Sequence, residues 1–199
     1  MEKDSRINYC NALIIGGSAG SLEVILAVLP DIEFPISFPI IIVVHRKSGN
    51  DNILTSLFET KTRLKVLEIE EKQPVLPGNI YLAPSDYHIL FEGDHTFSLD
   101  HSERVNYSRP SIDVAFQSAS EIYGKGLTAL LLSGANNDGV EGLRKIKSRG
   151  GVICIQNPGT AVVPYMPAQA AMAMTIDHIL EQKEIAEFIN QLSKKRPEE

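Results

Sequence analysis

Short apolar runs alternate with amphipathic segments along most of the chain. Apolar, strand-forming runs occupy residues 12–17, 40–45, 66–70, 79–84, 127–134 and 151–157, and each predicts a buried strand. The segments between and after these runs predict helices near 19–30, 53–60, 111–124, 140–149, 166–174 and 182–192. Pro30 is expected to end the first helix, Asn50 or Asp51 to cap the second, and Ser111 to cap the third.

One stretch departs from this alternation. In residues 88–100, two runs of strand-forming residues flank the sequence EGDH, which is the pattern of an antiparallel hairpin. Continuous apolar strands separated by helices are typical of a parallel sheet that is covered on both faces. We therefore predict a three-layer, doubly wound α/β fold with a mostly parallel sheet and one antiparallel hairpin. We expect this domain to span residues 12–194, between an N-terminal segment (1–11) and a polar tail (195–199).

Composition narrows the class of protein. The chain has 199 residues, of which 43% are hydrophobic and 22% charged, and its formal net charge of -6 argues against nucleic-acid binding. No apolar stretch reaches membrane-spanning length and no signal sequence begins the chain, so we predict a cytoplasmic protein without membrane insertion. The two cysteines, Cys10 and Cys154, form no zinc-binding pattern, and Cys154 lies in an apolar run typical of a buried thiol.

Three polar residues follow predicted parallel strands. Ser18 follows the first strand in the loop GGSAG, His45 ends the second, and Asp138 follows the strand at 127–134. Open parallel sheets bind ligands beyond the carboxyl ends of their strands, and Ser, His and Asp are the residue types that catalyse acyl transfer. We interpret Ser18 as the nucleophile, His45 as its base and Asp138 as the group that orients the base. The N–H groups at the start of the following helix, near Ala19, are suited to hold an oxyanion.

Each of these residues also has a purely structural interpretation. Ser18 could cap the helix that follows it, His45 could be a strand-end histidine with a satisfied hydrogen bond, and Asp138 could cap a helix or a turn. When each residue is considered alone, its sequence context supports the structural role at least as well as the catalytic one. The combination of three matching types at three strand ends favours catalysis.

Two other motifs compete for the glycine-rich loop. A dinucleotide-binding turn would need a further glycine and an acidic residue after the second strand, where His45 stands. The loop also matches G-x-S-x-G, the nucleophile elbow of α/β-hydrolases, for which Asp138 and His178 would complete the triad. That elbow follows several earlier strands, whereas Ser18 follows the first, so the elbow is the weaker fit.

Several motifs follow one another along nearly the whole chain. They are IIGGSAGS, VVHR, LPGNIYLAPSDYH, SRPSIDVAF, LLLSGANNDGVEGL and GGVICIQNPGTAVVPYMPAQA. In this order they resemble the catalytic domain of CheB, the bacterial chemotaxis receptor methylesterase. The resemblance assigns the family's catalytic serine, histidine and aspartate to Ser18, His45 and Asp138. It implies hydrolysis of glutamyl methyl esters on the cytoplasmic helices of methylated chemoreceptors, with release of methanol and without a metal or organic cofactor. Glutamine deamidation is a related activity of some members.

Some residues depart from the family pattern. Gly17 replaces the usual alanine, which we expect to be a mild change. Ala135 replaces a methionine whose backbone N–H helps to form the family's oxyanion hole, so we expect altered packing there more than lost activity. Arg46 stands where methionine is frequent; with Lys47 it is either a solvated charge pair or a contact for Glu-rich receptor helices. Arg109 is expected either to line the cleft or to form a structural salt bridge.

The resemblance leaves alternatives for function. Members of the family usually carry an N-terminal receiver domain, and nothing before Ala12 is long enough to form one, so the chain is expected to be either a stand-alone esterase or a fragment. A non-catalytic signalling module that binds receptor or partner helices is the main alternative. An esterase for small molecules at the same site is the third.

Overall fold

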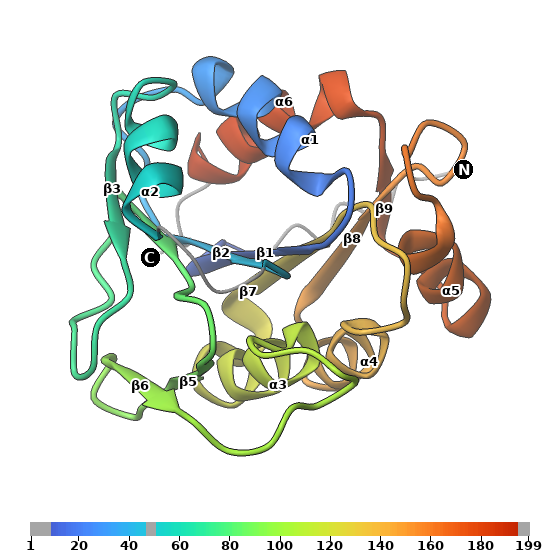
Figure 1. Ribbon diagram of the computed structural model, residues 1–199. Helices are drawn as coiled ribbons and strands as arrows, with labels where there is room; N and C mark the ends of the chain where they lie inside the picture. The colour runs from blue at the N-terminus through green and yellow to red at the C-terminus, as the bar shows by residue number, and fades with distance from the viewer. Residues whose placement is uncertain (1–8, 47–50, 195–199) are drawn as a thin grey trace.

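A seven-stranded parallel sheet forms the centre of the computed structural model, which describes residues 9–46 and 51–194 (Figure 1). Its strands lie in the order β3-β4-β2-β1-β7-β8-β9, and every neighbouring pair is parallel. The strands of this sheet are β1 (Ala12–Gly17), β2 (Ile40–Val44), β3 (Lys65–Glu68), β4 (Asn79–Leu82), β7 (Leu127–Leu131), β8 (Val152–Gln156) and β9 (His178–Leu180). A separate antiparallel pair consists of β5 (His88–Phe91) and β6 (Phe97–Asp100).

Helices cover both faces of the sheet. In Figure 1, α1, α2 and α6 lie on one side of it and α3 and α4 on the other, with α5 beyond β8. The helices are α1 (Ser21–Val28), α2 (Asp51–Glu59), α3 (Ile112–Tyr123), α4 (Val140–Ser148), α5 (Tyr165–Ala173) and α6 (Gln182–Lys194), with two 3-10 turns at Leu29–Asp31 and Gly124–Gly126. The predicted three-layer α/β fold with one antiparallel hairpin is confirmed.

Two hydrophobic cores result from the alternation of side chains along the strands. Leu13 and Ile15 of β1 pack in the core beneath α1 and α6, whereas Ile14 packs in the core beneath α3 and α4. Because successive side chains of a strand point to opposite faces, a strand between two helical layers must be apolar at every position. All six residues of β1 and all five of β2 are buried.

The order of the strands places the site. From β1 the chain proceeds to β2 on one side, and it later returns to the other side of β1 as β7. Beside β1 the strand order therefore reverses, and the loops after β1 and β7 diverge to opposite faces of the sheet. Such a reversal opens a crevice at the carboxyl ends of the strands.

Some local predictions differ from the structure. The first helix begins at Ser21 and not near Ala19, because Gly20 at φ 82 adopts a left-handed conformation that ends the turn after β1. The short edge strand β9 was not predicted, since three residues give too little pattern. Ser111 caps α3 as predicted, its Oγ accepting the Val114 N–H. Asn50, the tail and residues 1–8 lie outside the described residues, as does the side chain of Asp51.

Candidate active site

Ser18 and His45 follow adjacent strands and lie next to each other in the register. Gly17 of β1 pairs with Val44 of β2, and the His45 N–H donates to the Gly17 carbonyl over 3.1 Å. On its other side, the Ser18 N–H donates to the carbonyl of Ser133, which follows β7, over 2.9 Å. The backbone at Ser18 is thus fixed between the ends of two neighbouring strands.

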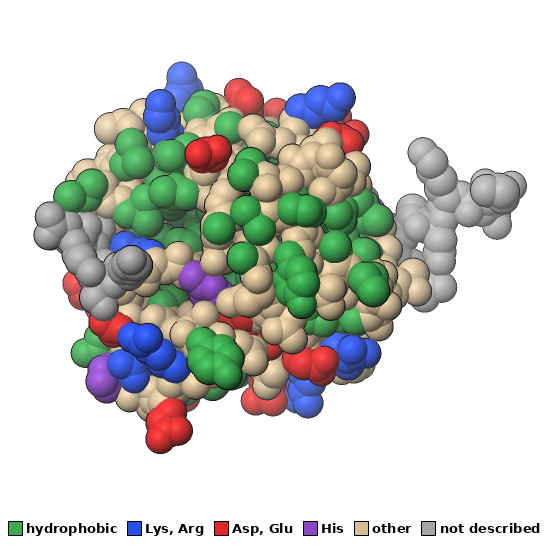
Figure 2. All heavy atoms as spheres, turned by 45° about the vertical axis from the view of Figure 1, so that its right-hand side comes forward, with side chains coloured by type: hydrophobic (Ala, Val, Ile, Leu, Met, Phe, Trp, Pro, Cys, Tyr) green, Lys and Arg blue, Asp and Glu red, His purple; other side chains and the backbone are tan. Residues whose placement is uncertain are grey.

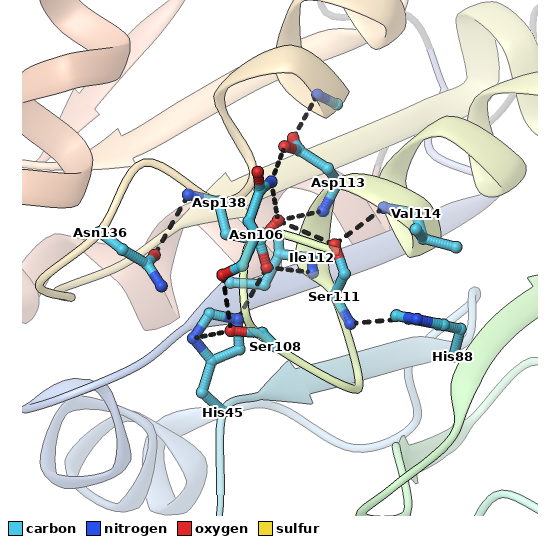
Figure 3. Close-up of polar contacts among 11 residues, drawn as sticks. His45, His88, Asn106, Ser108, Ser111, Ile112, Asp113, Val114, Asn136 and Asp138 are labelled. Carbon is cyan, nitrogen blue, oxygen red and sulfur yellow. Dashed lines mark hydrogen bonds and ion pairs between the residues drawn. The ribbon is translucent and has the colours of Figure 1, made fainter. Parts of the chain in front are cut away.

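His45 and Asp138 are in direct contact. The Nε2 atom of His45 lies 2.7 Å from Oδ2 of Asp138, and the imidazole side chain is 13% exposed whereas the carboxylate is fully buried (Figure 3). The structure therefore brings together two of the three residues that were predicted to form a triad.

The Asp138 carboxylate also lies at the N-terminus of α3. Its Oδ2 accepts the Ile112 N–H over 2.7 Å, and its Oδ1 accepts the Asp113 N–H over 3.0 Å. Oδ1 also accepts hydrogen bonds from Ser111 Oγ at 2.9 Å and Asn106 Nδ2 at 3.1 Å. Helix N-termini favour negative charge because their first N–H groups have no partner within the helix. The structural interpretation of Asp138 as a cap thus holds for α3, and it coexists with the contact to His45.

These donors keep Asp138 ionised. Burial alone would raise the pKa of this carboxyl group, but the hydrogen bonds from His45 and from the N–H groups of Asp113 and Ile112 outweigh it and lower the pKa. A carboxylate that is ionised and accepts a hydrogen bond from Nε2 requires the proton of neutral His45 to lie on that nitrogen. Nδ1 is then the nitrogen that can accept a proton.

The hydroxyl of Ser108 contacts that nitrogen. Its Oγ lies 3.4 Å from His45 Nδ1, a long contact, and within 3.4 Å of the Asn106 carbonyl (Figure 3). Ser18 Oγ makes no hydrogen bond to any residue that the structure describes. Gly20 occupies the cap position of α1 without a side-chain hydrogen bond, so the interpretation of Ser18 as a helix cap is wrong.

The tight turn that ends at Ser108 was not predicted from the sequence. Val105 and Ser108 exchange two backbone hydrogen bonds, and Asn106 and Tyr107 between them have φ of 50° and 63°. This is the conformation of a tight turn whose two central residues are both left-handed. Asparagine tolerates the left-handed conformation well, so Asn106 was the signal in the sequence that could have indicated this turn. Tyr107 does not favour that conformation.

Two backbone N–H groups near Ser18 have no partner. Among the described residues, neither Ala19 nor Ala135 donates its N–H in a hydrogen bond, and both residues are exposed. Ser133 braces the surrounding backbone, because its Oγ contacts the Ala19 carbonyl at 2.8 Å and accepts the Val163 N–H at 2.9 Å. The loops after β1 and β7 thus each provide an unused donor near Ser18.

Two glycines near Ser18 leave no room for a side chain. A Cβ at Gly134 would lie 2.5 Å from Met166 Cε and 3.0 Å from Ser18 Cβ. A Cβ at Gly17 would lie 2.4 Å from Cβ of the buried Ser21. An alanine at residue 17, the usual residue of the family, would therefore have to displace Ser21 in this chain.

A cleft of about 500 Å³ opens beside His45. Its lining is rich in arginine, and it consists of His45, Arg46, Asp86, Arg104, Tyr107, Ser108 and Arg109. Figure 2 shows a histidine in a hollow of the surface, with apolar side chains gathered to one side of it. Ser18, which directly follows β1, is not among the described residues that line this cleft.

Two arginines of the cleft, Arg46 and Arg109, are held by hydrogen bonds within the protein. Arg46 is 14% exposed and donates through Nη2 to Glu68 at 3.1 Å and to the Ala83 carbonyl at 2.9 Å, so it is not a solvated charge; Lys47 lies outside the described residues. Arg109 lines the cleft and donates to the carbonyls of His101 and Ser102, which ties the loop to itself through carbonyls and not through a salt bridge.

The alternative triad with His178 is wrong. His178 begins β9, and its ring packs 5.0 Å from that of Phe188 on α6, whereas Asp138 binds His45. In the part of the chain that the structure describes, no three His, Cys, Asp or Glu side chains are placed to hold a metal ion. No helix of that part is long and apolar enough to cross a membrane.

A parallel α/β sheet with a His–carboxylate pair at the carboxyl ends of its central strands is typical of hydrolytic enzymes. Comparison with known proteins specifies the class, because residues 13–189 match the model of the CheB methylesterase family. The chain therefore belongs to the CheB methylesterase family and is an esterase.

Individual relatives agree with this assignment. A Leptospira interrogans protein provisionally named protein-glutamate methylesterase/protein-glutamine glutaminase is 41% identical over 97% of this chain and 100% of its own length. A Thermotoga maritima protein-glutamate methylesterase/protein-glutamine glutaminase is 31% identical over 90% of the chain, which spans 53% of that relative. The crystal structure of the Thermotoga maritima CheB methylesterase catalytic domain superimposes with a TM-score of 0.88 at 30% identity, covering 93% of this chain and all of that one.

Proposed function

We propose that this chain hydrolyses the methyl esters of glutamate side chains on the cytoplasmic helices of chemoreceptors, with Ser18, His45 and Asp138 as its catalytic triad. The observation that carries the proposal is the 2.7 Å contact between His45 Nε2 and the buried, ionised Asp138, beside the strand end where Ser18 lies. The names of the relatives supply the substrate class, a protein glutamate methyl ester.

The contact between His45 Nε2 and Asp138 supports Nδ1 of His45 as the base. In the proposed reaction the Ser18 hydroxyl attacks the ester carbonyl carbon while His45 Nδ1 takes its proton, and Asp138 stabilises the imidazolium through Nε2–H. The Ala19 and Ala135 N–H groups hold the oxyanion. The imidazolium then gives its proton to the departing methoxide, which leaves as methanol. A water molecule attacks the acyl-enzyme by the same route and releases the glutamate carboxylate and Ser18.

In this mechanism the Ser18 hydroxyl and His45 Nδ1 come within hydrogen-bonding distance of each other when substrate binds. Catalytic hydrogen bonds are often long or misaligned before substrate arrives, and the existing contact to Ser108 is long. With a glutamine amide in place of the ester, the same steps would release ammonia, in keeping with the second half of the relatives' name.

Ser108 is the alternative nucleophile, because it is the hydroxyl within 3.4 Å of His45 Nδ1. We favour Ser18 because it lies between two strand ends and beside unused N–H groups. The arginine-rich cleft suits a substrate helix with acidic side chains near the ester, so Arg46 and Arg109 stay our predicted substrate contacts.

The test compares Ser18→Ala with Ser108→Ala as matched variants. Methanol release from purified methylated chemoreceptor should fall at least about a thousandfold in Ser18→Ala and less than about tenfold in Ser108→Ala. Labelling with a fluorophosphonate, followed by peptide mass spectrometry, should modify Ser18. Loss of turnover only in Ser108→Ala would mean that Ser108, and not Ser18, is the nucleophile. A wild-type chain that neither releases methanol nor is labelled would support the non-catalytic signalling module, and turnover of small esters alone would support the small-molecule esterase.

A further inference from the structure

The side chain of Asn106 joins two buried carboxylates. Its Nδ2 donates to Asp113 Oδ2 over 2.8 Å and to Asp138 Oδ1 over 3.1 Å (Figure 3). An amide nitrogen carries two hydrogens, so both bonds can form at once. The turn that presents this amide is the one that also places Ser108 against His45.

Asp113 is a carboxylate that the proposed reaction does not use. It lies in the first turn of α3 and is 6% exposed. Its Oδ1 accepts the Gly142 N–H of α4 over 2.7 Å, so it ties α4 to the start of α3. Burial, and then the neighbouring Asp138 charge, raise the pKa of Asp113 to about 6 although the Gly142 N–H lowers it.

The charged groups around this pair come from several elements. Asp138 faces Asp113 from the loop before α4, and His45 reaches the pair from the end of β2 through Asp138. On β5, His88 accepts the Ser111 N–H at Nδ1 over 3.1 Å, one residue before α3. In the described residues, the donor shared by the two carboxylates is the neutral amide of Asn106.

We propose that Asn106 is a positioning residue of the active site, which clamps Asp138 to Asp113 and so holds the His45–Asp138 pair and the Ser108 turn in one arrangement. Two like charges side by side in a buried site repel each other, and a donor shared between them offsets that repulsion. Without the clamp, one carboxylate takes up a proton more readily and the turn loses its anchor. The effect of the clamp on catalysis rests on the proposed function. Its effect on the two carboxylates does not.

Two substitutions separate the donor from the space that Asn106 fills. Asn106→Gly removes the amide while still allowing the left-handed backbone, at φ 50, that alanine would strain. Asn106→Asp keeps the size of the side chain but removes the donor and adds a third carboxylate. If Asn106 only fills space, Asn106→Asp should be tolerated better than Asn106→Gly. If Asn106 is a clamp, Asn106→Asp should be the more damaging of the two near neutral pH.

The first readout needs no substrate. Carbon-13 NMR of the aspartate carboxyls should show the Asp113 titration moving upward by about one pH unit in Asn106→Gly. Nitrogen-15 shifts of the His45 ring should show a smaller population protonated at Nε2. In the ester assay, kcat should fall about tenfold with little change in KM. The acid limb of the pH profile should move upward, because Asp138 also loses a donor and takes up a proton more readily.

The matched control is Asn190→Asp. Asn190 is also a buried asparagine whose amide donates, to the Asp31 carbonyl over 2.9 Å, but it lies on α6 on the other face of the sheet. This variant should lower Tm without changing the carboxyl titrations, the His45 shifts or the acid limb. The proposal is overturned if Asn106→Gly leaves the titrations and the His45 shifts unchanged, or if Asn106→Asp retains wild-type turnover. A wild-type chain with no esterase activity counts against the proposed function, while the two NMR readouts still decide whether the clamp exists.

Discussion

His45 Nε2 lies 2.7 Å from Asp138 Oδ2, although 93 residues separate the two along the chain. The same carboxylate accepts the first N–H groups of α3, so one side chain serves both the histidine and the fold. A group with two such roles should show both losses when it is changed.

Asp138→Asn should lower both stability and turnover. The asparagine amide would face donors at the N-terminus of α3, which would leave buried N–H groups without an acceptor at a cost of about 2–4 kcal/mol. Turnover should fall about a thousandfold or more, because the imidazole loses the acceptor that fixes its tautomer. Chemical denaturation and methanol release measure the two effects. His45→Ala should lose as much turnover at a smaller cost in stability; equal stability of the two variants would contradict the capping role of Asp138.

Asp113 should make stability depend on pH. Its folded-state pKa, about 6, lies above the ordinary value near 3.9, so its contribution to stability is fully present below about pH 4 and is lost as pH rises through 6. The loss is on the order of 2 kcal/mol. Asp113→Asn removes this titration, so the free energy of unfolding of the variant relative to wild type should rise between pH 4 and 7.

The measurement is urea unfolding of both proteins at several pH values. Asp138 has a lowered pKa and contributes in the opposite sense, with stability that is lost as pH falls, but it does so in both proteins. The difference between them therefore reports the titration of Asp113 together with its electrostatic coupling to Asp138. A difference that stays constant from pH 4 to 7 would show that Asp113 has an ordinary pKa in the folded state.

Gly134→Ala should disturb Ser18 directly. The new methyl group would press on Met166 and on Ser18 Cβ, and overpacking of this kind costs about 1–3 kcal/mol. The displaced serine should react with fluorophosphonate at least about tenfold more slowly, since small misplacements of reacting groups cost large factors in rate. Gly93→Ala is the matched control, because no atom lies within 4 Å of its added methyl group. Equal labelling rates in the two variants would refute the close packing at Ser18.

Both cysteines should resist alkylation in the folded protein. Burial raises the pKa of the Cys10 thiol to about 12 and that of Cys154 well above its usual value, so neither forms the reactive thiolate near neutral pH. Iodoacetamide at pH 8 should modify neither residue until denaturant is added, and then both, as followed by mass spectrometry. Rapid modification of Cys154 under native conditions would mean that β8 opens to solvent.

Much of the architecture could be predicted from the pattern of residues. Strands such as Ile40–Val44 are apolar at every position because both of their faces are covered, and that local pattern is enough to indicate a parallel sheet between helices. The strand ends that carry Ser18, His45 and Asp138 follow from the same pattern. The ordered motifs added the family, which the comparisons confirmed. The edge strand at His178–Leu180 escaped because three residues carry too little periodicity.

The arrangement within the site was decided by tertiary structure. Composition and spacing do not tell which nitrogen of His45 meets Asp138, because that depends on where α3 begins relative to the loop after β7. Nor do they bring Asn106 and Asp113 to Asp138, since these contacts join a tight turn, a helix start and a loop from separate parts of the chain. The sequence alone determined which residues follow the strands, because a buried strand must be apolar at every position and that pattern is visible in the local sequence. Only the fold determined which side chains share a proton. A hydrogen bond between distant segments forms or fails with a change of a few tenths of an ångström in their separation.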